Sequence, residues 1–235
     1  MPDAAASPVS RPGWVFFLGR AILRPTFWLL FRTRVSGRER IPVTGPVLLA
    51  ANHLSGWDTV LIPVASPRPV QFLSKQSLFT GRGARGRFVR WFFTSIGGVP
   101  VVRAAGRDAQ AALEAGSAIL RAGSVFAVFP EGSRSRDGRL YQGRSGAAWM
   151  ALETGAVVVP VGLIGTADVR PLGWLVGGIR PQVVFGEPVE LADLTGSAPG
   201  AARRIATARI MDAIAALTGQ ERADHVSSTS TDALP

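Results

Sequence analysis

Short apolar runs alternate with longer amphipathic segments along most of this chain. Runs bounded by turn-forming residues read as buried strands, and they predict strands at residues 47–51, 70–74, 99–102, 125–129, 157–164 and 183–185. Apolar residues at helical spacing predict helices at about 58–65, 84–95, 107–122, 144–154 and 201–218. Such alternation is typical of α/β proteins, so we expect a single domain with a central, mostly parallel or mixed sheet covered by helices.

The segment before the first strand, residues 13–32, is dense in aromatic and aliphatic side chains but is interrupted by Arg20, Arg24 and Pro25. A membrane-spanning helix needs about 20 predominantly apolar residues, and the arginines also break the apolar region of a cleavable signal peptide. Two short amphipathic helices in the membrane interface fit better, because arginines can meet headgroups while aromatic side chains enter lipid. The alternative is a helix packed on the protein's own core.

The two ends of the chain have a different composition. Residues 1–12 are rich in Ala, Pro and Ser, and residues 220–235 are polar and include one of the two histidines, His225. Both compositions predict disorder. No internal repeat or linker divides what lies between, so residues 33–219 are expected to form one domain.

Charge and cysteine content narrow the classes of partner and site. The formal net charge is +10, carried almost entirely by arginine, with Lys75 the only lysine. This balance indicates an anionic partner such as a membrane surface or a phosphorylated substrate. No dense Lys/Arg run with interleaved aromatics points to nucleic acid. The absence of cysteine excludes disulfides, thiolate zinc sites and a Cys nucleophile, and no metal or cofactor is predicted.

Candidate chemistry begins directly after the first predicted strand, in the segment Asn52 to Asp58. His53 is the only histidine outside the predicted tail, and Asp58 follows it five residues later. An imidazole acts as a general base when a carboxylate orients it, but an extended segment would separate the two side chains by roughly 16 Å. Because Ser55 and Gly56 favour a turn, we predict that Asp58 folds back onto His53 at a strand end that faces a cleft.

Two further strand ends carry groups that suit a phosphate. Phe129 to Arg136 reads Phe-Pro-Glu-Gly-Ser-Arg-Ser-Arg and offers backbone N–H groups, hydroxyls and a guanidinium in one turn. Gly97 to Arg103 is a glycine-led strand that ends in arginine. Since ligands collect at the carboxyl ends of strands in α/β sheets, Arg103 and Arg134 are expected to meet near His53. A fourth run, Val157 to Gly162, contains Pro160, which predicts a bulge or a sheet edge.

These four segments, in this order, resemble the signatures of the bacterial 1-acylglycerol-3-phosphate O-acyltransferase family. The resemblance runs from about residue 14 to 218. It includes Asn52, His53 and Asp58 for the first signature and Phe129 to Ser135 for the third, where Ser133 replaces the usual Thr and keeps the hydroxyl. Phe72 to Phe79 resembles the family's Lys-bearing stretch through Lys75, although Gln76 and Ser77 depart from its usual residues.

The resemblance implies an enzyme that moves a fatty acyl group from acyl-CoA or acyl-carrier protein to the sn-2 hydroxyl of 1-acylglycerol-3-phosphate, giving phosphatidic acid. It implies that His53 is the general base, that Asp58 orients it, and that no acyl-enzyme forms. The substrate-binding residues that it implies are Lys75, Arg103, Glu131, Gly132, Ser133 and Arg134. The partners would be membrane lipids, lysophosphatidic acid and the acyl thioester, and the location would be peripheral, on the cytoplasmic face of the cell membrane.

Several alternatives stay open. The acceptor could be glycerol-3-phosphate or another lysophospholipid. Ser145, an aspartate and His225 stand in the chain order of a serine hydrolase, although Ser145 does not follow a strand. Condensation-type acyltransferases share the His-x₄-Asp spacing but carry a second adjacent His, where this chain has Asn52. A non-enzymatic, membrane-bound anion-binding protein would also explain the basic and apolar features.

Overall fold

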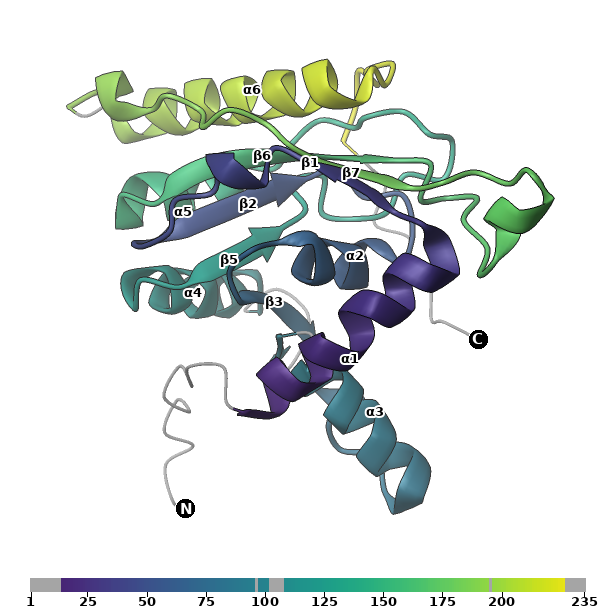
Figure 1. Cartoon of the computed structure of the whole chain (residues 1–235). Helices are drawn as coiled ribbons and strands as arrows, with labels where there is room; N and C mark the ends of the chain where they lie inside the picture. Colours follow the sequence, from purple (N-terminus) through teal and green to yellow (C-terminus); the bar gives the residue numbers. More distant parts are fainter. Residues whose placement is uncertain (1–13, 96, 102–107, 195, 227–235) are drawn as a thin grey trace, which may run out of the picture.

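The computed structural model describes residues 14–95, 97–101, 108–194 and 196–226. Within them, seven strands form one sheet in the order β1-β7-β6-β2-β5-β3-β4 (Figure 1). Strands β2 to β6 are parallel, whereas β7 pairs antiparallel with β6 and parallel with β1. The strands are β1 (Arg34–Ser36), β2 (Val47–Ala51), β3 (Val70–Lys75), β4 (Gly98–Val101), β5 (Val125–Val128), β6 (Val157–Ile164) and β7 (Gln182–Phe185). The predicted α/β class with a mixed sheet is confirmed.

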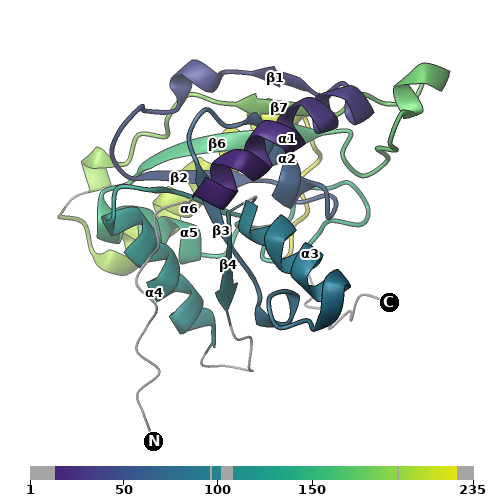
Figure 2. The ribbon, with the colours of Figure 1, turned by 60° about the horizontal axis from the view of Figure 1, so that its bottom comes forward.

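Helices cover both faces of this sheet. One apolar core lies between the sheet and the layer of α1 (Trp14–Phe31), α2 (Asp58–Ala65) and α3 (Gly83–Ser95) (Figure 2). The second lies between the sheet and the layer of α4 (Asp108–Arg121), α5 (Gly146–Thr154) and α6 (Pro199–Thr218). Because both faces are covered, the central strands bury every residue or nearly so, as in β2, and this is why they read as continuous apolar runs.

The strand at the β7 edge, β1, was not predicted. It has only three residues, and its alternating exposure leaves Val35 alone half-buried. An edge strand of this kind has no apolar run in its sequence, because only one of its side chains faces the core. The predictions for β2 and β6, in contrast, match the observed bounds.

Pro160 does not lie in an edge strand, contrary to that part of the prediction, but the pairing is irregular beside it: Val161 pairs with Phe185 and Val158 with Val189, which leaves one extra residue on the β7 side, as in a bulge. It lies in β6, between β2 and β7, opposite Ala50. Its carbonyl accepts a hydrogen bond from the Gly186 N–H at 2.8 Å, so its nitrogen faces the same side. The β6–β7 ladder begins only at Val161, opposite Phe185. The missing N–H of Pro160 therefore falls just past the end of β7, where no ladder bond is lost.

The N-terminal segment forms one helix, α1, rather than two short ones. It continues through Pro25, since Phe27 and Phe31 beyond the proline are buried in the core and tertiary packing outweighs the local penalty. The opposite face of α1 stays open, with side chains exposed by 47–74% at Trp14, Phe17, Leu18, Ile22, Trp28 and Leu29. The alternative of a helix packed on the protein's own core is therefore correct for one face of α1, and the opposite face is exposed.

Residues 220–226 are not the free tail that their polarity predicted. Leu140 forms a bridge with Arg222 and exchanges hydrogen bonds with Glu221 and Ala223. The Gln142 N–H donates to the His225 carbonyl at 3.2 Å. Backbone pairing with residues 140–142 orders this segment, and composition does not reveal such pairing. The predicted disorder at residues 1–12 and 227–235 falls outside the described residues.

Candidate active site

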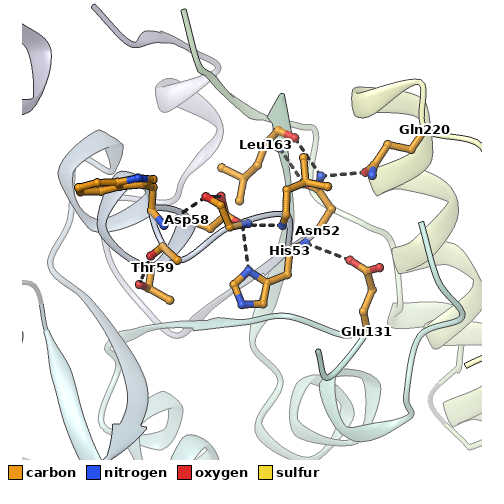
Figure 3. Close-up of polar contacts among 11 residues, drawn as sticks. Asn52, His53, Asp58, Thr59, Glu131, Leu163 and Gln220 are labelled. Carbon is orange, nitrogen blue, oxygen red and sulfur yellow. Dashed lines mark hydrogen bonds and ion pairs between the residues drawn. The ribbon is translucent and has the colours of Figure 1, made fainter. Parts of the chain in front are cut away.

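His53 and Asp58 meet at the carboxyl end of β2, as predicted (Figure 3). A turn over residues 54–57 separates them, and Asp58 begins α2. The carboxylate Oδ2 lies 2.9 Å from His53 Nδ1. The short sequence spacing therefore produces direct contact, because the turn reverses the chain between the strand end and the helix.

Asp58 is fully buried and its oxygens are satisfied by the turn itself. Oδ2 accepts the backbone N–H groups of Leu54 at 2.6 Å and Ser55 at 2.8 Å, in addition to the histidine. The first turn of α2 also favours a negative charge through the helix dipole. A buried carboxylate with these donors stays in one orientation, so it fixes His53 with Nδ1 as the hydrogen-bond donor.

The imidazole of His53 is held on its flat face as well. The ring of Phe129 stacks on it with centroids 3.9 Å apart and planes 11° from parallel. The side chain keeps 15% exposure, and within the described part of the chain no hydrogen bond reaches Nε2. With Nδ1 donating to Asp58, Nε2 is the nitrogen that can accept a proton from an incoming hydroxyl.

Asn52, the residue before the histidine, is buried and ties three parts of the chain together. Its Oδ1 accepts the Leu163 N–H at 2.7 Å, and its Nδ2 donates to the Leu163 carbonyl at 2.9 Å. Nδ2 also donates to Gln220 Oε1 at 2.8 Å, and Gln220 Nε2 donates to the Gly138 carbonyl. Gln220 thus connects the end of β2 to the loop after β5. The sequence analysis missed it because it lies in the segment assigned to the tail.

We expect Gln220→Ala to lower kcat roughly 3- to 10-fold with little change in KM, as for the loss of hydrogen bonds worth about 1 kcal/mol. Gln220→Glu keeps the acceptor for Asn52 and should recover most of the rate. The matched control is Gln142→Ala, which removes a side-chain bond to the same C-terminal segment at Asp224 without touching Asn52. A steady-state turnover assay that gave equal losses for both alanine variants would assign Gln220 a purely structural role.

Glu131 is fully buried beneath the histidine loop. Its Oε1 accepts the His53 N–H and its Oε2 accepts the Tyr141 N–H, both at 2.9 Å. Burial raises the pKa of Glu131 to about 7, with smaller increases from the charges of Asp58 and Asp137, against the lowering effect of the two N–H donors. The resemblance placed this residue at a phosphate pocket, and its contacts are those of a group that positions the backbone of His53.

A raised carboxyl pKa predicts a specific pH dependence of stability. Between about pH 4.5 and 7 the folded chain holds a proton that the unfolded chain has lost, so the free energy of unfolding falls as pH rises through this window, by roughly 3 kcal/mol in total. The glutamine in the variant Glu131→Gln cannot ionise, so the free energy of unfolding of this variant should not show this fall with rising pH. Between pH 5 and pH 8 we therefore expect the Tm of wild type to fall by roughly 5–10 °C more than that of the variant.

The control for this measurement is Glu153→Gln, at a half-exposed glutamate paired with Arg121 on the surface. Its pH slope in differential scanning calorimetry should match that of wild type. A Glu131→Gln slope that also matched wild type would contradict a raised pKa at Glu131.

The loop that follows Phe129 lies directly against the histidine. The Ser135 N–H donates to the His53 carbonyl at 2.7 Å, which brings the adjacent, exposed Arg134 to the same edge of the sheet. Gly132 has φ of +79°, and a Cβ there would come 2.6 Å from Nε of Arg144. The positive φ favours glycine here, and any other side chain would also have to displace Arg144. Arg144 is a basic side chain at this loop that the phosphate prediction did not include.

The second predicted phosphate segment is described only in part. Gly97 has φ of +87°, and a Cβ there would lie 1.9 Å from the Val70 carbonyl oxygen, so β4 can start beside β3 only from a glycine. Arg103 lies outside the described residues, and so does the side chain of Lys75, whose backbone ends β3. Their predicted approach to His53 therefore stays a prediction.

The serine-hydrolase arrangement is not formed. No hydrogen bond in the described part of the chain joins Ser145 to His225, whose ring packs edge-on against Tyr141 with centroids 5.3 Å apart. Across the same residues, no group of three or more His, Cys, Asp or Glu side chains is placed to hold a metal ion.

The comparison with known families agrees with the geometry of the site. The family model described as Acyltransferase matches residues 32–164, which include His53, Asp58 and the loop after Phe129. The chain belongs to the acyltransferase family. Gln220 lies beyond the matched region, so that match carries no information on it.

Individual relatives are similar over part of their length. The 1-acyl-sn-glycerol-3-phosphate acyltransferase of Borreliella burgdorferi is 32% identical over 152 residues, covering 64% of this chain and 59% of the relative. The chloroplastic 1-acyl-sn-glycerol-3-phosphate acyltransferase of Arabidopsis thaliana is 28% identical over 158 residues, 67% of this chain and 43% of the relative. The chain thus spans less than two thirds of both curated relatives.

A solved structure shares the fold more completely. The 1-acyl-sn-glycerophosphate acyltransferase of Thermotoga maritima matches with a TM-score of 0.58 and 25% identity, over 88% of this chain and 79% of that one.

Proposed function

We propose that this acyltransferase moves a fatty acyl group from a thioester to the free hydroxyl of 1-acylglycerol-3-phosphate and so makes phosphatidic acid. The observation that carries the proposal is the His53–Asp58 pair at the end of β2, with an open Nε2 beside an arginine-bearing loop. The relatives from Borreliella, Arabidopsis and Thermotoga are named as acyltransferases of this acceptor, which supports the choice.

His53 would serve as the general base. Its Nε2 takes the proton of the acceptor hydroxyl while that oxygen attacks the thioester carbonyl carbon. The C–O bond forms, the C–S bond breaks, and the imidazolium returns its proton to the leaving thiolate. Asp58 stabilises the imidazolium meanwhile and keeps Nδ1 protonated. The transfer is direct, with acyl-CoA or acyl-carrier protein as the donor and no acyl-enzyme.

Arg134, with the backbone N–H groups of Ser133 and Arg134 in the turn that Gly132 forms, would bind the phosphate of the acceptor, since the N–H groups of Gly132 and Ser135 already donate within the protein. Arginine binds phosphate in bidentate fashion, and Arg144 adds positive charge at the same loop. Lys75 and Arg103 are expected to complete the site from β3 and from the chain beyond β4. Glu131 would act from below by positioning the His53 backbone.

Peripheral contact with the cytoplasmic face of the membrane would bring the lipid acceptor to this site. Within the described residues no helix has the length and hydropathy to cross a bilayer. The open face of α1 is nonetheless apolar, and the turn Gly173–Val176 adds Leu175 and Val176, exposed by 62% and 87%. This turn lies next to the end of α1, since the Leu172 N–H donates to the Leu30 carbonyl at 2.7 Å. We propose that both enter the interface.

The test is thiol release from a long-chain acyl-CoA in detergent micelles, with 1-acylglycerol-3-phosphate as the acceptor and phosphatidic acid identified as the product. Monoacylglycerol, which lacks the phosphate, should react at least ~100-fold more slowly in kcat/KM, because charge-assisted phosphate contacts are each worth about 1.5–3 kcal/mol. Glycerol-3-phosphate as the better acceptor would move the proposal to that substrate. No turnover with either acceptor or with other lysophospholipids would favour a non-enzymatic anion-binding protein.

A further inference from the structure

A groove of about 540 Å³ is lined by residues of α1, of α2 and of the segment that includes β1. Its walls include Phe27 and Trp28 from α1 and Leu61 and Val64 from α2. Two arginines, Arg24 and Arg38, line it as well, and the described residues that form the groove include no carboxylate. The volume falls within the roughly 300–1,000 Å³ typical of ligand pockets, and the combination of cations with apolar walls suits an anionic amphiphile.

No acidic side chain among the described residues pairs with Arg20, Arg24 or Arg38. Arg38 donates through Nε to the Ala65 carbonyl at 2.8 Å, and Arg20 donates to the carbonyls of Pro63 and Ser66, so both cap the C-terminus of α2. Arg24 makes no hydrogen bond or ion pair within the described chain. Burial, together with Arg24 and Arg38, lowers the pKa of Arg20 to about 10. An anion at this position would relieve the repulsion among the three guanidinium groups.

The groove is continuous with the exposed apolar face of α1. Trp28 belongs to both, since it lines the groove and is 55% exposed. Arg24 lies on the flank of the helix between its open and its buried face, whereas Arg20 lies on the buried side and binds the carbonyls of α2. With the open face in the interface, Arg24 would stand at headgroup depth. A lipid could then pass from the bilayer into the groove without entering the aqueous phase.

We propose that this groove binds one anionic phospholipid of the surrounding bilayer, with its phosphate at Arg24 and Arg38 and part of one acyl chain against Trp28, Leu61 and Val64. The site is distinct from the reacting centre, because the groove follows α2 from Leu61 to Ala65, whereas Asp58 is the first residue of that helix. The inference rests on the proposed membrane contact of α1 and is independent of the acyl-transfer chemistry.

Monomeric dihexanoyl-phosphatidylglycerol, titrated calorimetrically below its critical micelle concentration, is the probe. We expect saturable binding with one lipid per chain. Dihexanoyl-phosphatidylcholine, which carries a compensating cation, and inorganic phosphate, which has no chain, should each bind at least ~10-fold more weakly. Arg24→Ala should weaken phosphatidylglycerol binding by about 10-fold or more, the effect of one charge-assisted hydrogen bond, and leave acyl transfer in detergent unchanged.

Two variants serve as controls. Arg34→Ala removes the same charge from β1, but strand alternation places its side chain on the face opposite Val35, which lines the groove. Arg134→Ala tests whether the probe binds instead at the loop beside His53. Both should bind the probe as wild type does.

Several outcomes would overturn the inference. If inorganic phosphate bound as tightly as phosphatidylglycerol, the groove would be a simple anion site. If phosphatidylcholine bound as tightly, the arginines would not select for an anionic lipid.

If Arg24→Ala and Arg34→Ala weakened binding equally, the effect would come from the general charge of the protein. If only Arg134→Ala weakened binding, the lipid would bind at the loop beside His53. The acyl-transfer function is tested only by the detergent assay, and the lipid groove only by the binding titration. A failure of one proposal can therefore be distinguished from a failure of the other.

Discussion

His53→Ala is expected to lower kcat for acyl transfer by roughly 10³- to 10⁴-fold, because the variant loses the group that we propose removes the acceptor proton. KM for the acceptor should change little, since the arginine-bearing loop is untouched. The fold should persist, because the contacts of residue 53 with Glu131 and Ser135 are made by its backbone. The measurement is acyl transfer in micelles beside a thermal melt of the same preparation.

The chain supplies its own control in the second histidine. His225→Ala removes a ring that packs on Tyr141 and makes no contact with His53, so its kcat should equal that of wild type. Turnover by His53→Ala at the wild-type rate would contradict the assignment of the base, and a loss of equal size in both variants would point to a general effect on the fold.

Asp58→Asn should lower kcat by about 10²- to 10⁴-fold, since an amide no longer fixes the imidazole with Nδ1 as donor or stabilises the imidazolium. It should also lower the free energy of unfolding by roughly 2–3 kcal/mol. Oδ2 now accepts three N–H groups, and an amide of either orientation leaves buried donors poorly paired. Nitrogen NMR of the imidazole would report the change of tautomer directly.

Asp193→Asn is the matched substitution on the surface, where Asp193 pairs with Arg209 and is 58% exposed. Exposed ion pairs contribute little to stability, because solvent screens them, so this variant should be near wild type in both assays. If Asp58→Asn kept the wild-type rate while losing stability, the pair would be a structural feature of the turn and not a catalytic one.

The central elements were predictable because their surroundings impose one pattern. Strands β2 and β6 are covered on both faces, so burial alone requires continuous apolar runs. Prediction from the sequence failed for elements whose residues do not all face the same kind of environment. Strand β1 faces the core with one residue, and α1 is apolar on the face that packs and on the face that stays open. Periodicity cannot separate those two faces, and the two-helix prediction followed Pro25 instead.

Within the site, local contacts were predictable and distant ones were not. His53 and Asp58 are five residues apart, so turn propensity at Ser55 and Gly56 was enough to bring them together. Glu131 lies 78 residues from His53, and Gln220 lies 168 residues from Asn52. Asn52 does carry a signal, because a polar residue at the end of a fully buried strand needs hydrogen-bond partners. The sequence does not say which ones.

The hydrogen bond from Asn52 to Gln220 has a consequence for how the enzyme is made. During synthesis α1 and β2 leave the ribosome before β6, which lies beside β2, and before Gln220, both of which follow more than a hundred residues later. Domains form from the N-terminus onward as the chain emerges. A nascent chain can therefore expose the apolar face of α1 while His53 and Asn52 still lack the contacts that β6 and Gln220 supply. The end of β2 that carries His53 is completed only when the last of these contacts has formed.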